Sequence, residues 1–399
     1  MNRHRLCTQR KALRLRSLIA VAGLLAVACG GAGSDTSPPS TEPAPSPAAA
    51  SSESFVARFG GGWKTDFTQA LVSPDVFTIG QTKDGIPAID RPVFLPPAKA
   101  TFLEPQEPVV ALEVNSDARA YPLQILIWHE IVNDVVGGVP VMVTFCPLCN
   151  TSIVFERTVG GRILDFGTTG LLHKSDLVMY DRQTESWWQQ ITGDAVVGEM
   201  AGARLEIVPS AIVSWEEFVA AYPEGQVLSL DTGFDRPYGR NPYTGYDRVD
   251  SDPFLFEGET DPRLLPMERV AAVELNGETV AYPFSRLESQ PVVYDTVGGT
   301  EIVVLFKKGT VSALDRASIA DSKDVGATGV FLPAVDGKRL TLTAREEGFV
   351  DAETGSRWNV LGQALDGPLA GARLTPVVHG NHFWFAWAAF KPETRIWAP

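Results

Sequence analysis

The stretch Val109–Asn115 (VVALEVN) recurs as Val270–Asn276 (VAAVELN), at a shift of 161 residues (270 − 109). Other stretches match at this shift or at a slightly larger one. They are Ala120–Pro122 with Ala281–Pro283, Val136–Gly138 with Val297–Gly299, and Ala201–Leu205 with Ala370–Leu374. The sequence therefore predicts a diverged internal duplication, in which two similar units pack on each other.

The repeated stretches have the signature of β-strands. Ile131–Val136 and Val139–Phe145 flank Gly137-Gly138, a two-residue turn that tolerates positive φ. Helical periodicity is scarce, and we predict helices only at Leu123–Ile127 and Ser214–Tyr222, the second with a capping box. We expect a mainly β (α+β) fold of two β-rich pseudo-repeats packed together. The apolar C-terminal run 383–390 is predicted to be buried core.

The first residues have the composition of an export signal. Basic residues up to Arg16 precede an apolar stretch, Leu18–Ala28, which is too short to span a bilayer. The small residues before Cys29 resemble the lipobox of bacterial lipoproteins, so we predict lipidation of Cys29, with plain secretion as the alternative. We therefore place the protein in the cell envelope, anchored to the membrane by lipid at the outer face of the cytoplasmic membrane or in the periplasm.

Composition divides the chain further. Residues 30–54 are almost wholly Gly, Ser, Thr, Pro and Ala, which is typical of a flexible tether. The predicted parts are a signal peptide (1–28), a lipidated cysteine with a disordered tether (29–54), an N-terminal extension (55–105), a first repeat with the CxxC motif (106–265) and a second, degenerate repeat (266–399). The signal contains six basic residues, so the mature net charge is about −20 (−14 − 6). Such an acidic surface argues against nucleic acid as a partner.

Two cysteines remain in the folded body, in the motif Cys146–Cys149 (CPLC), because Cys7 lies in the signal and Cys29 is the lipid site. The second repeat has Lys307–Thr310 (KKGT) in the same place, so the fold does not require thiols there. A disulfide across so short a loop would add only about 2 kcal/mol of stability. We therefore interpret the motif as reactive or metal-binding, with a structural disulfide as the alternative.

The residues after the motif, Thr151–Phe155, are β-branched and favour a strand. In thioredoxin-like proteins a helix begins at the CxxC motif, and its dipole favours the thiolate. We therefore do not expect a thioredoxin fold, and any activation of Cys146 must come from nearby cations or a metal.

Histidines are scarce, and two of them are candidates to act with the thiols. His129, next to Glu130, lies one predicted hairpin before the motif, and His173 follows it. A protonated imidazole lowers a thiol pKa and carries protons, whereas a neutral one completes a zinc or copper(I) site. The alternatives are a core histidine for His129 and a surface loop for His173.

Two further groups are weaker candidates. His379 and His382 have the spacing of a ligand pair, although their aromatic surroundings favour a structural role. Asp181-Arg182 and Glu185 could line a polar pocket, but the second repeat retains the Asp, Thr, Ser and Trp of this segment, which favours turn geometry and packing. The sequence has no phosphate-binding glycine loop, no GxSxG and no HExxH motif.

Several of these stretches resemble a family of exported bacterial and archaeal proteins, the domain-of-unknown-function family 3179. The matching stretches are Gly85–Phe94, Ala120–Asp134, Val143–Asn150, Leu171–Gln190 and Phe383–Phe390. The resemblance implies no established activity. Some relatives are labelled as candidate selenoproteins, which implies a redox role for the motif.

We therefore formulate three hypotheses. The first is a tethered extracytoplasmic thiol–disulfide oxidoreductase, with Cys146 attacking, Cys149 resolving, His129 and Glu130 handling protons, and a protein or small molecule as redox partner. The second is a copper- or zinc-binding protein, with Cys146, Cys149, His129 and His173 as ligands. The third is a non-catalytic binding or scaffold lipoprotein.

Overall fold

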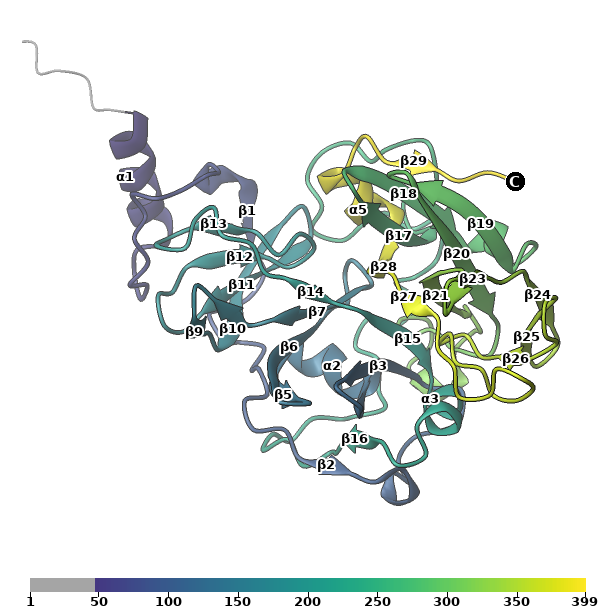
Figure 1. Cartoon of the computed structure of the whole chain (residues 1–399). Coiled ribbons are helices and arrows are strands. Elements are labelled where there is room, and N and C mark those ends of the chain that lie inside the picture. The colour runs from purple at the N-terminus through teal and green to yellow at the C-terminus, as the bar shows by residue number, and fades with distance from the viewer. Residues whose placement is uncertain (1–46) are drawn as a thin grey trace, which may run out of the picture. The chain divides into compact units, whose positions relative to one another are not determined.

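The structure, a computed structural model, describes residues 47–399, and β-strands form most of its regular structure (Figure 1). The fold is mainly β, as predicted, and consists of several small sheets. The predicted signal peptide, Cys29 and most of the predicted tether lie outside the described residues. Within residues 47–399, no helix has both the length and the apolar character needed to cross a bilayer.

The N-terminal extension begins with helix α1 (Pro47–Phe59), which lies partly inside the predicted tether. Phe55 and Phe59 are buried against the indole of Trp187, with ring centroids 5.9 and 5.4 Å away. These contacts give the helix a buried face, and Ala48–Ala50 have high helix propensity. The prediction of a disordered segment up to residue 54 was therefore wrong for Pro47 onward.

The N-terminal extension and the first repeat together contain four sheets in the described chain, whose neighbouring strands follow the orders β15-β3-β4-β16-β2, β14-β7-β6-β5, β1-β10-β11-β12-β13 and β8-β9. The strands are β1 Phe77–Ile79, β2 Phe94–Leu95, β3 Pro108–Val114, β4 Asp117–Pro122, β5 Ile131–Val136, β6 Val139–Cys146, β7 Thr151–Glu156, β8 Thr158–Val159, β9 Arg162–Ile163, β10 Phe166–His173, β11 Asp176–Asp181, β12 Trp187–Gln189, β13 Ala195–Val197, β14 Ile207–Val208, β15 Ser210–Ser214 and β16 Gln226–Leu228. The helices are α2 Leu123–His129 and α3 Trp215–Ala221, and the short 3₁₀ turns are η1 Pro74–Val76 and η2 Pro97–Lys99.

The second repeat contains sheets with the orders β28-β17-β18-β29, β19-β20-β21-β27, β24-β25-β26 and β22-β23. Its strands are β17 Arg269–Leu275, β18 Glu278–Pro283, β19 Val292–Val297, β20 Thr300–Lys307, β21 Ala327–Leu332, β22 Ala334–Val335, β23 Lys338–Arg339, β24 Leu342–Arg345, β25 Gly348–Asp351, β26 Arg357–Trp358, β27 Thr375–Pro376, β28 His379–Phe383 and β29 Arg395–Ile396. Its helices are α4 Phe284–Leu287, α5 Trp384–Phe390 and the 3₁₀ turn η3 Ile319–Asp321.

Matching sheets of the two repeats have the same strand order. The order β15-β3-β4-β16 corresponds to β28-β17-β18-β29, and β14-β7-β6-β5 corresponds to β27-β21-β20-β19. The first hairpin pairs Val109 with Pro122, and its counterpart pairs Val270 with Pro283, at the 161-residue shift. Order and register agree with two pseudo-repeats, whereas their origin by duplication stays a prediction.

The predicted hairpins and helices of the first repeat are present. Strands β5 and β6 pair around Gly137-Gly138, and both glycines have positive φ. Helix α2 covers Leu123–Ile127, and α3 is capped by Ser214, whose Oγ accepts from the Glu217 backbone N–H at 3.2 Å. The C-terminal apolar run is largely buried, as predicted, and most of it forms α5.

Reciprocal ion pairs connect the two repeats. Arg373 of the second repeat pairs with Glu113 of the first, and Arg204 of the first lies 3.7 Å from Glu274 of the second. Both arginines belong to the repeated AGARL sequence, and both glutamates belong to the repeated stretch that begins at Val109 or Val270. The repeats also share hydrophobic clusters, in which Val109 packs in the same core as Val303. These matching sequences therefore hold the interface between the repeats.

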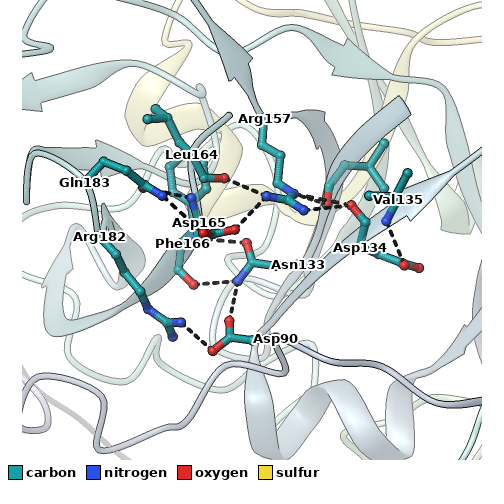
Figure 2. Close-up of polar contacts among 11 residues, drawn as sticks. Asp90, Asn133, Asp134, Val135, Arg157, Leu164, Asp165, Phe166, Arg182 and Gln183 are labelled. Carbon is teal, nitrogen blue, oxygen red and sulfur yellow. Dashed lines mark hydrogen bonds and ion pairs between the residues drawn. The ribbon is translucent and has the colours of Figure 1, made fainter. Parts of the chain in front are cut away.

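A buried polar network joins two sheets of the first repeat (Figure 2). The Arg157 guanidinium, whose side chain is 9% exposed, pairs with Asp165 at 2.7 Å and donates to three backbone carbonyls. Asn133 of β5 exchanges hydrogen bonds with the backbone of Phe166 in β10 and donates to Asp90 at 2.8 Å. The network fixes β10, and therefore the hairpin that it begins, relative to the sheet containing the CxxC motif.

Candidate functional site

The CxxC motif forms the turn between β6 and β7. Cys146 is the last residue of β6 and pairs with Thr151, and Asn150 closes the turn with a φ of +49°. Asn tolerates this left-handed conformation. The carbonyl of Cys149 accepts from the backbone N–H of Phe383, at 2.8 Å, so β28 of the second repeat holds the turn. A strand, β7, follows the motif, as predicted from the sequence, so the motif itself does not begin a helix.

Both thiols are free and buried, with Cys146 1% and Cys149 0% exposed. They point at one backbone carbonyl, that of Ser175, with sulfur–oxygen distances of 3.9 and 3.4 Å. Ser175 is in the turn between β10 and β11, where it and Lys174 both have positive φ. The next residue, Asp176, places a carboxylate oxygen beside the two sulfurs, and these three atoms lie within 4.8 Å of one another.

The Asp176 carboxylate is fully buried and only partly satisfied. Its Oδ2 accepts from the Ile191 backbone N–H at 3.0 Å and from the Gln189 side-chain amide, whereas its Oδ1 has no hydrogen-bond partner within the described chain. The carbonyl of the Gln189 amide accepts from Nδ1 of His173 at 2.9 Å. His173 therefore orients Gln189, and Gln189 orients Asp176.

Acidic groups accumulate at this site. Burial raises the pKa of Cys149 well above its ordinary value, and burial together with Asp176 and Glu130 raises the pKa of Cys146. Burial raises the pKa of Asp176 to about 7 and, with a contribution from Asp176, that of Glu130 to about 8. Without a cation the site therefore favours protonated thiols and carboxyls.

Glu130 is placed by the end of α2. It caps the helix in the left-handed conformation, with a φ of +58°, and its backbone N–H donates to Leu126 at 2.7 Å. The residue is 7% exposed, and its carboxyl forms no hydrogen bond with any residue from 47 to 399. The predicted proximity of Glu130 to the thiols agrees with its effect on the pKa of Cys146.

His129 does not contact the thiols. Its Nδ1 is 2.7 Å from the carbonyl of Pro87, and its Nε2 is 2.7 Å from the hydroxyl of Tyr238. The carbonyl can only accept, so Nδ1 carries the proton and Tyr238 donates to Nε2. Both ring nitrogens are therefore occupied, and the structure does not bring His129 to the sulfurs as we expected. His173 also lies outside the Cys146, Cys149 and Asp176 cluster and braces it instead.

A segment that we call the cap, residues 229–268, covers the site and has no helix or strand. Tyr246 donates to the carbonyl of Leu148 inside the CxxC motif at 3.0 Å, and Ser175 Oγ donates to the carbonyl of Phe254 at 2.6 Å. The pKa of Tyr243 is raised by burial and by the nearby Glu130 and Cys146. The cap thus seals the thiols from solvent, and His129 holds one of its tyrosines.

The corresponding place in the second repeat has different chemistry. Lys307, at the position of Cys146, pairs with Glu217 of the first repeat. The hairpin strand β25 has 4 residues, whereas its counterpart β11 has 6. The hairpin of the second repeat is therefore shorter and lacks the part that carries Asp176 in the first repeat. The thiols and the carboxylate are therefore confined to one repeat.

The retained Asp–Thr–Ser–Trp set has the structural role that we inferred. Trp188 donates to Asp181 at 3.0 Å, and Trp358 donates to Asp351 at 2.9 Å, in matching turns. Arg182 pairs with Asp90 in the network of Figure 2, and Glu185 pairs with Lys83 at 2.8 Å. None of these contacts reaches the thiols.

The weak histidine pair is also structural in its contacts. His382 is 2.9 Å from the Thr151 hydroxyl and stacks on Trp387, and burial lowers its pKa to about 3. His379 and His382 lie on the extended strand β28, where a spacing of three residues places side chains on opposite faces. The residue that sequence reasoning missed is Asp176, for which the only sequence signal was its place directly after the turn residues Lys174-Ser175.

Comparison with known proteins identifies the family. The model of the family described as "Protein of unknown function (DUF3179)" matches residues 83–394. This range covers most of the chain, so the protein belongs to that family. No curated protein and no solved structure shows significant similarity to the chain.

Proposed function

We propose that this family member is a metal-binding protein that holds a zinc ion, or alternatively copper(I), between Cys146, Cys149 and Asp176. The proposal is carried by one observation: two sulfurs and a carboxylate oxygen lie within 4.8 Å of one another in a sealed site. The unpartnered Oδ1 of Asp176 supports it, because buried polar atoms normally have partners. The predicted envelope location and lipid anchor at Cys29 remain part of this proposal.

The donor set favours zinc. Zinc takes thiolate, imidazole and carboxylate ligands in tetrahedral sites, whereas copper(I) prefers soft sulfur ligands alone. Two thiolates and Asp176 supply three ligands and a total charge of −3, which a divalent ion offsets better than a monovalent one. Binding would displace the thiol protons, because thiolates are the ligands. Glu130, buried nearby without a hydrogen bond, is the residue from which a fourth oxygen could come.

Thiol–disulfide exchange, our first expectation from the sequence, becomes the second candidate. It is favoured by the closeness of the two sulfurs and by the free state of both cysteines. It is opposed by burial, because exchange needs a thiolate that a partner can reach, and both thiols are sealed with raised pKa values. Exchange would therefore require the cap to open.

Metal analysis of the purified protein separates the candidates. We expect about one zinc per chain in the wild type after anaerobic preparation, and almost none in Cys146→Ser or Cys149→Ser. Thr310→Ser is the matched control, since Thr310 has the place of Cys149 in the second repeat. No stoichiometric metal together with a titratable disulfide would refute metal binding and favour redox chemistry. If the protein has neither a bound metal nor a titratable disulfide, both of these candidates are refuted and the scaffold hypothesis is favoured.

A further inference from the structure

A cleft of about 260 Å³ lies between the two repeats, away from the thiols. Its lining is mainly apolar and comes from both repeats, including Ala111 and Ala211 of the first and Val330, Phe331 and Leu374 of the second. The ion pair between Arg373 and Glu113 also lines it, and the arginine is 48% exposed, so this pair lies on the solvent side. Clefts between packed units are preferred places for small-molecule sites.

The cleft leads to a much smaller polar cavity. This cavity has a volume of about 10 Å³, enough for a single water molecule, and shares Ser210, Ala211 and His379 with the cleft. Ser152 also lines it, and its hydroxyl is buried without a hydrogen-bond partner in the described chain. An unsatisfied hydroxyl therefore lies at the inner end of an apolar space.

His379 forms part of the wall of this cavity, beside Ser152. Its Nδ1 is 3.1 Å from the carbonyl of Val377, and its Nε2 is 3.4 Å from the carbonyl of Thr328. Burial lowers the pKa of His379, so the ring is neutral and carries one N–H. The carbonyl oxygens of Val377 and Thr328 already face the two ring nitrogens, so a ligand cannot bond to the ring directly. The polar group that is left for a ligand is the Ser152 hydroxyl, which can donate and accept.

We propose that this cleft is a binding site for a small, mainly apolar molecule that ends in a hydroxyl group. The hydroxyl enters the polar cavity and forms a hydrogen bond with the Ser152 hydroxyl, and the apolar body fills the cleft. A site built to hydrogen-bond a hydroxyl discriminates against the analogue without it, because its polar groups are then left unpaired. This site is independent of the metal site.

The volume sets the size of the ligand. An engineered apolar cavity of about 150 Å³ accommodates benzene in another protein. A cleft of about 260 Å³ therefore accepts a substituted six-membered ring. We choose 4-fluorobenzyl alcohol as the probe and 4-fluorotoluene, which lacks the hydroxyl, as its matched control. Binding to the purified full-length chain is measured by fluorine NMR line broadening.

Two variants test the two parts of the site. Ala211 lines both cavities, so Ala211→Leu should abolish binding of both probes. Ser152→Ala removes one hydrogen bond and should weaken the alcohol roughly tenfold while leaving fluorotoluene unchanged. In the wild type the alcohol should bind roughly tenfold more tightly than fluorotoluene.

Three results would overturn the proposal. They are no broadening of the alcohol at millimolar concentration, equal binding of the two probes by the wild type, or unchanged alcohol binding in Ser152→Ala. Ser152→Ala keeps the test valid if Ala211→Leu fails to fold, since it only deletes an unpaired oxygen. The far-UV circular dichroism spectrum and the urea-unfolding midpoint of each variant serve as the folding control, so the test does not depend on whether the protein binds a metal.

Discussion

Replacement of Asp176 by asparagine should stabilise the metal-free protein and weaken its metal binding. The buried carboxyl has its pKa raised from 3.8 to about 7, mainly by burial. Between these values the folded state keeps a proton that the unfolded state releases. Stability therefore falls as pH rises through this window and stays at the lower value above it. The asparagine side chain does not ionise, so this loss would be absent from the variant.

The magnitude follows from the size of the shift. About three pKa units at about 1.4 kcal/mol each correspond to about 4 kcal/mol. The amide oxygen of the new side chain can still accept from the Ile191 N–H and from Gln189, so the existing hydrogen bonds persist. We expect Asp176→Asn to gain up to about 4 kcal/mol at pH 8 with a chelator present, and almost nothing at pH 4.

Urea unfolding at both pH values, with EDTA, measures the stability part, and competition with a zinc chromophore measures affinity. The variant should bind zinc at least roughly a hundredfold more weakly, because a direct ligand is lost. Asp321→Asn, which changes an exposed acid of the second repeat, is the control. The reasoning is refuted if Asp176→Asn is less stable than the wild type at pH 8 in EDTA, or if its zinc affinity is unchanged.

Three further predictions concern the scaffold and the cap. Removal of the buried guanidinium in Arg157→Met should cost about 3 kcal/mol in urea unfolding, because the backbone carbonyls of Asp134, Val141 and Leu164 lose a charged donor, whereas Asp165 keeps its bond from Gln183 and is half exposed; a cost below about 1 kcal/mol would contradict the role of the network in Figure 2. Tyr246→Phe removes a hydrogen bond between the cap and the motif and should speed thiol labelling by Ellman's reagent roughly tenfold under native conditions; an unchanged rate would mean that this contact does not hold the cap. Burial lowers the pKa of His382 to about 3, so His382 removes about 1.4 kcal/mol of folding stability per pH unit below pH 6.5, as the unfolded imidazole takes up a proton, and this contribution opposes that of Asp176. His382→Phe should therefore gain stability relative to the wild type by about 1.4 kcal/mol per pH unit as the pH falls from 6 to 4, and a difference that stays constant with pH would contradict the assignment.

Local pattern was sufficient to predict much of the first repeat. The strands flanking Gly137-Gly138 are mainly apolar runs of six and eight residues, and the two-residue glycine turn between them sets their register. The short helices were also predictable, because Ser214 is an N-cap residue and Leu123–His129 follows Pro122 directly. The restriction of the two cysteines to the first repeat predicted a site there, and in the structure Cys146, Cys149 and Asp176 of that repeat lie together.

The complete site was not predictable, because its third member comes from a distant hairpin. Asp176 is one of 48 acidic residues, so nothing in its type distinguished it, whereas the 5 histidines attracted attention by their rarity. The tip of the β10–β11 hairpin, with its two left-handed residues, brings Asp176 to the sulfurs. His129 is close to the CxxC motif in the sequence. Its ring nitrogens nevertheless form hydrogen bonds with Pro87 and Tyr238, which are 42 and 109 positions away from it.

The N-terminal helix was also not predictable, because it depends on contacts with residues that are distant in the sequence. The composition before Phe55 is that of a flexible tether, yet the helix forms because Phe55 and Phe59 are buried against Trp187, more than a hundred residues later. Tertiary packing, rather than local propensity, decides such marginal helices.

X-ray absorption at the metal edge tests the central claim most directly, because it identifies the atoms around the bound ion. For zinc-loaded protein we expect two sulfur scatterers at about 2.3 Å, with oxygen at about 2.0 Å that diminishes in Asp176→Asn. A zinc shell without sulfur, or a sulfur shell that persists in the Cys146→Ser, Cys149→Ser double variant, would contradict the assignment of these thiols as ligands.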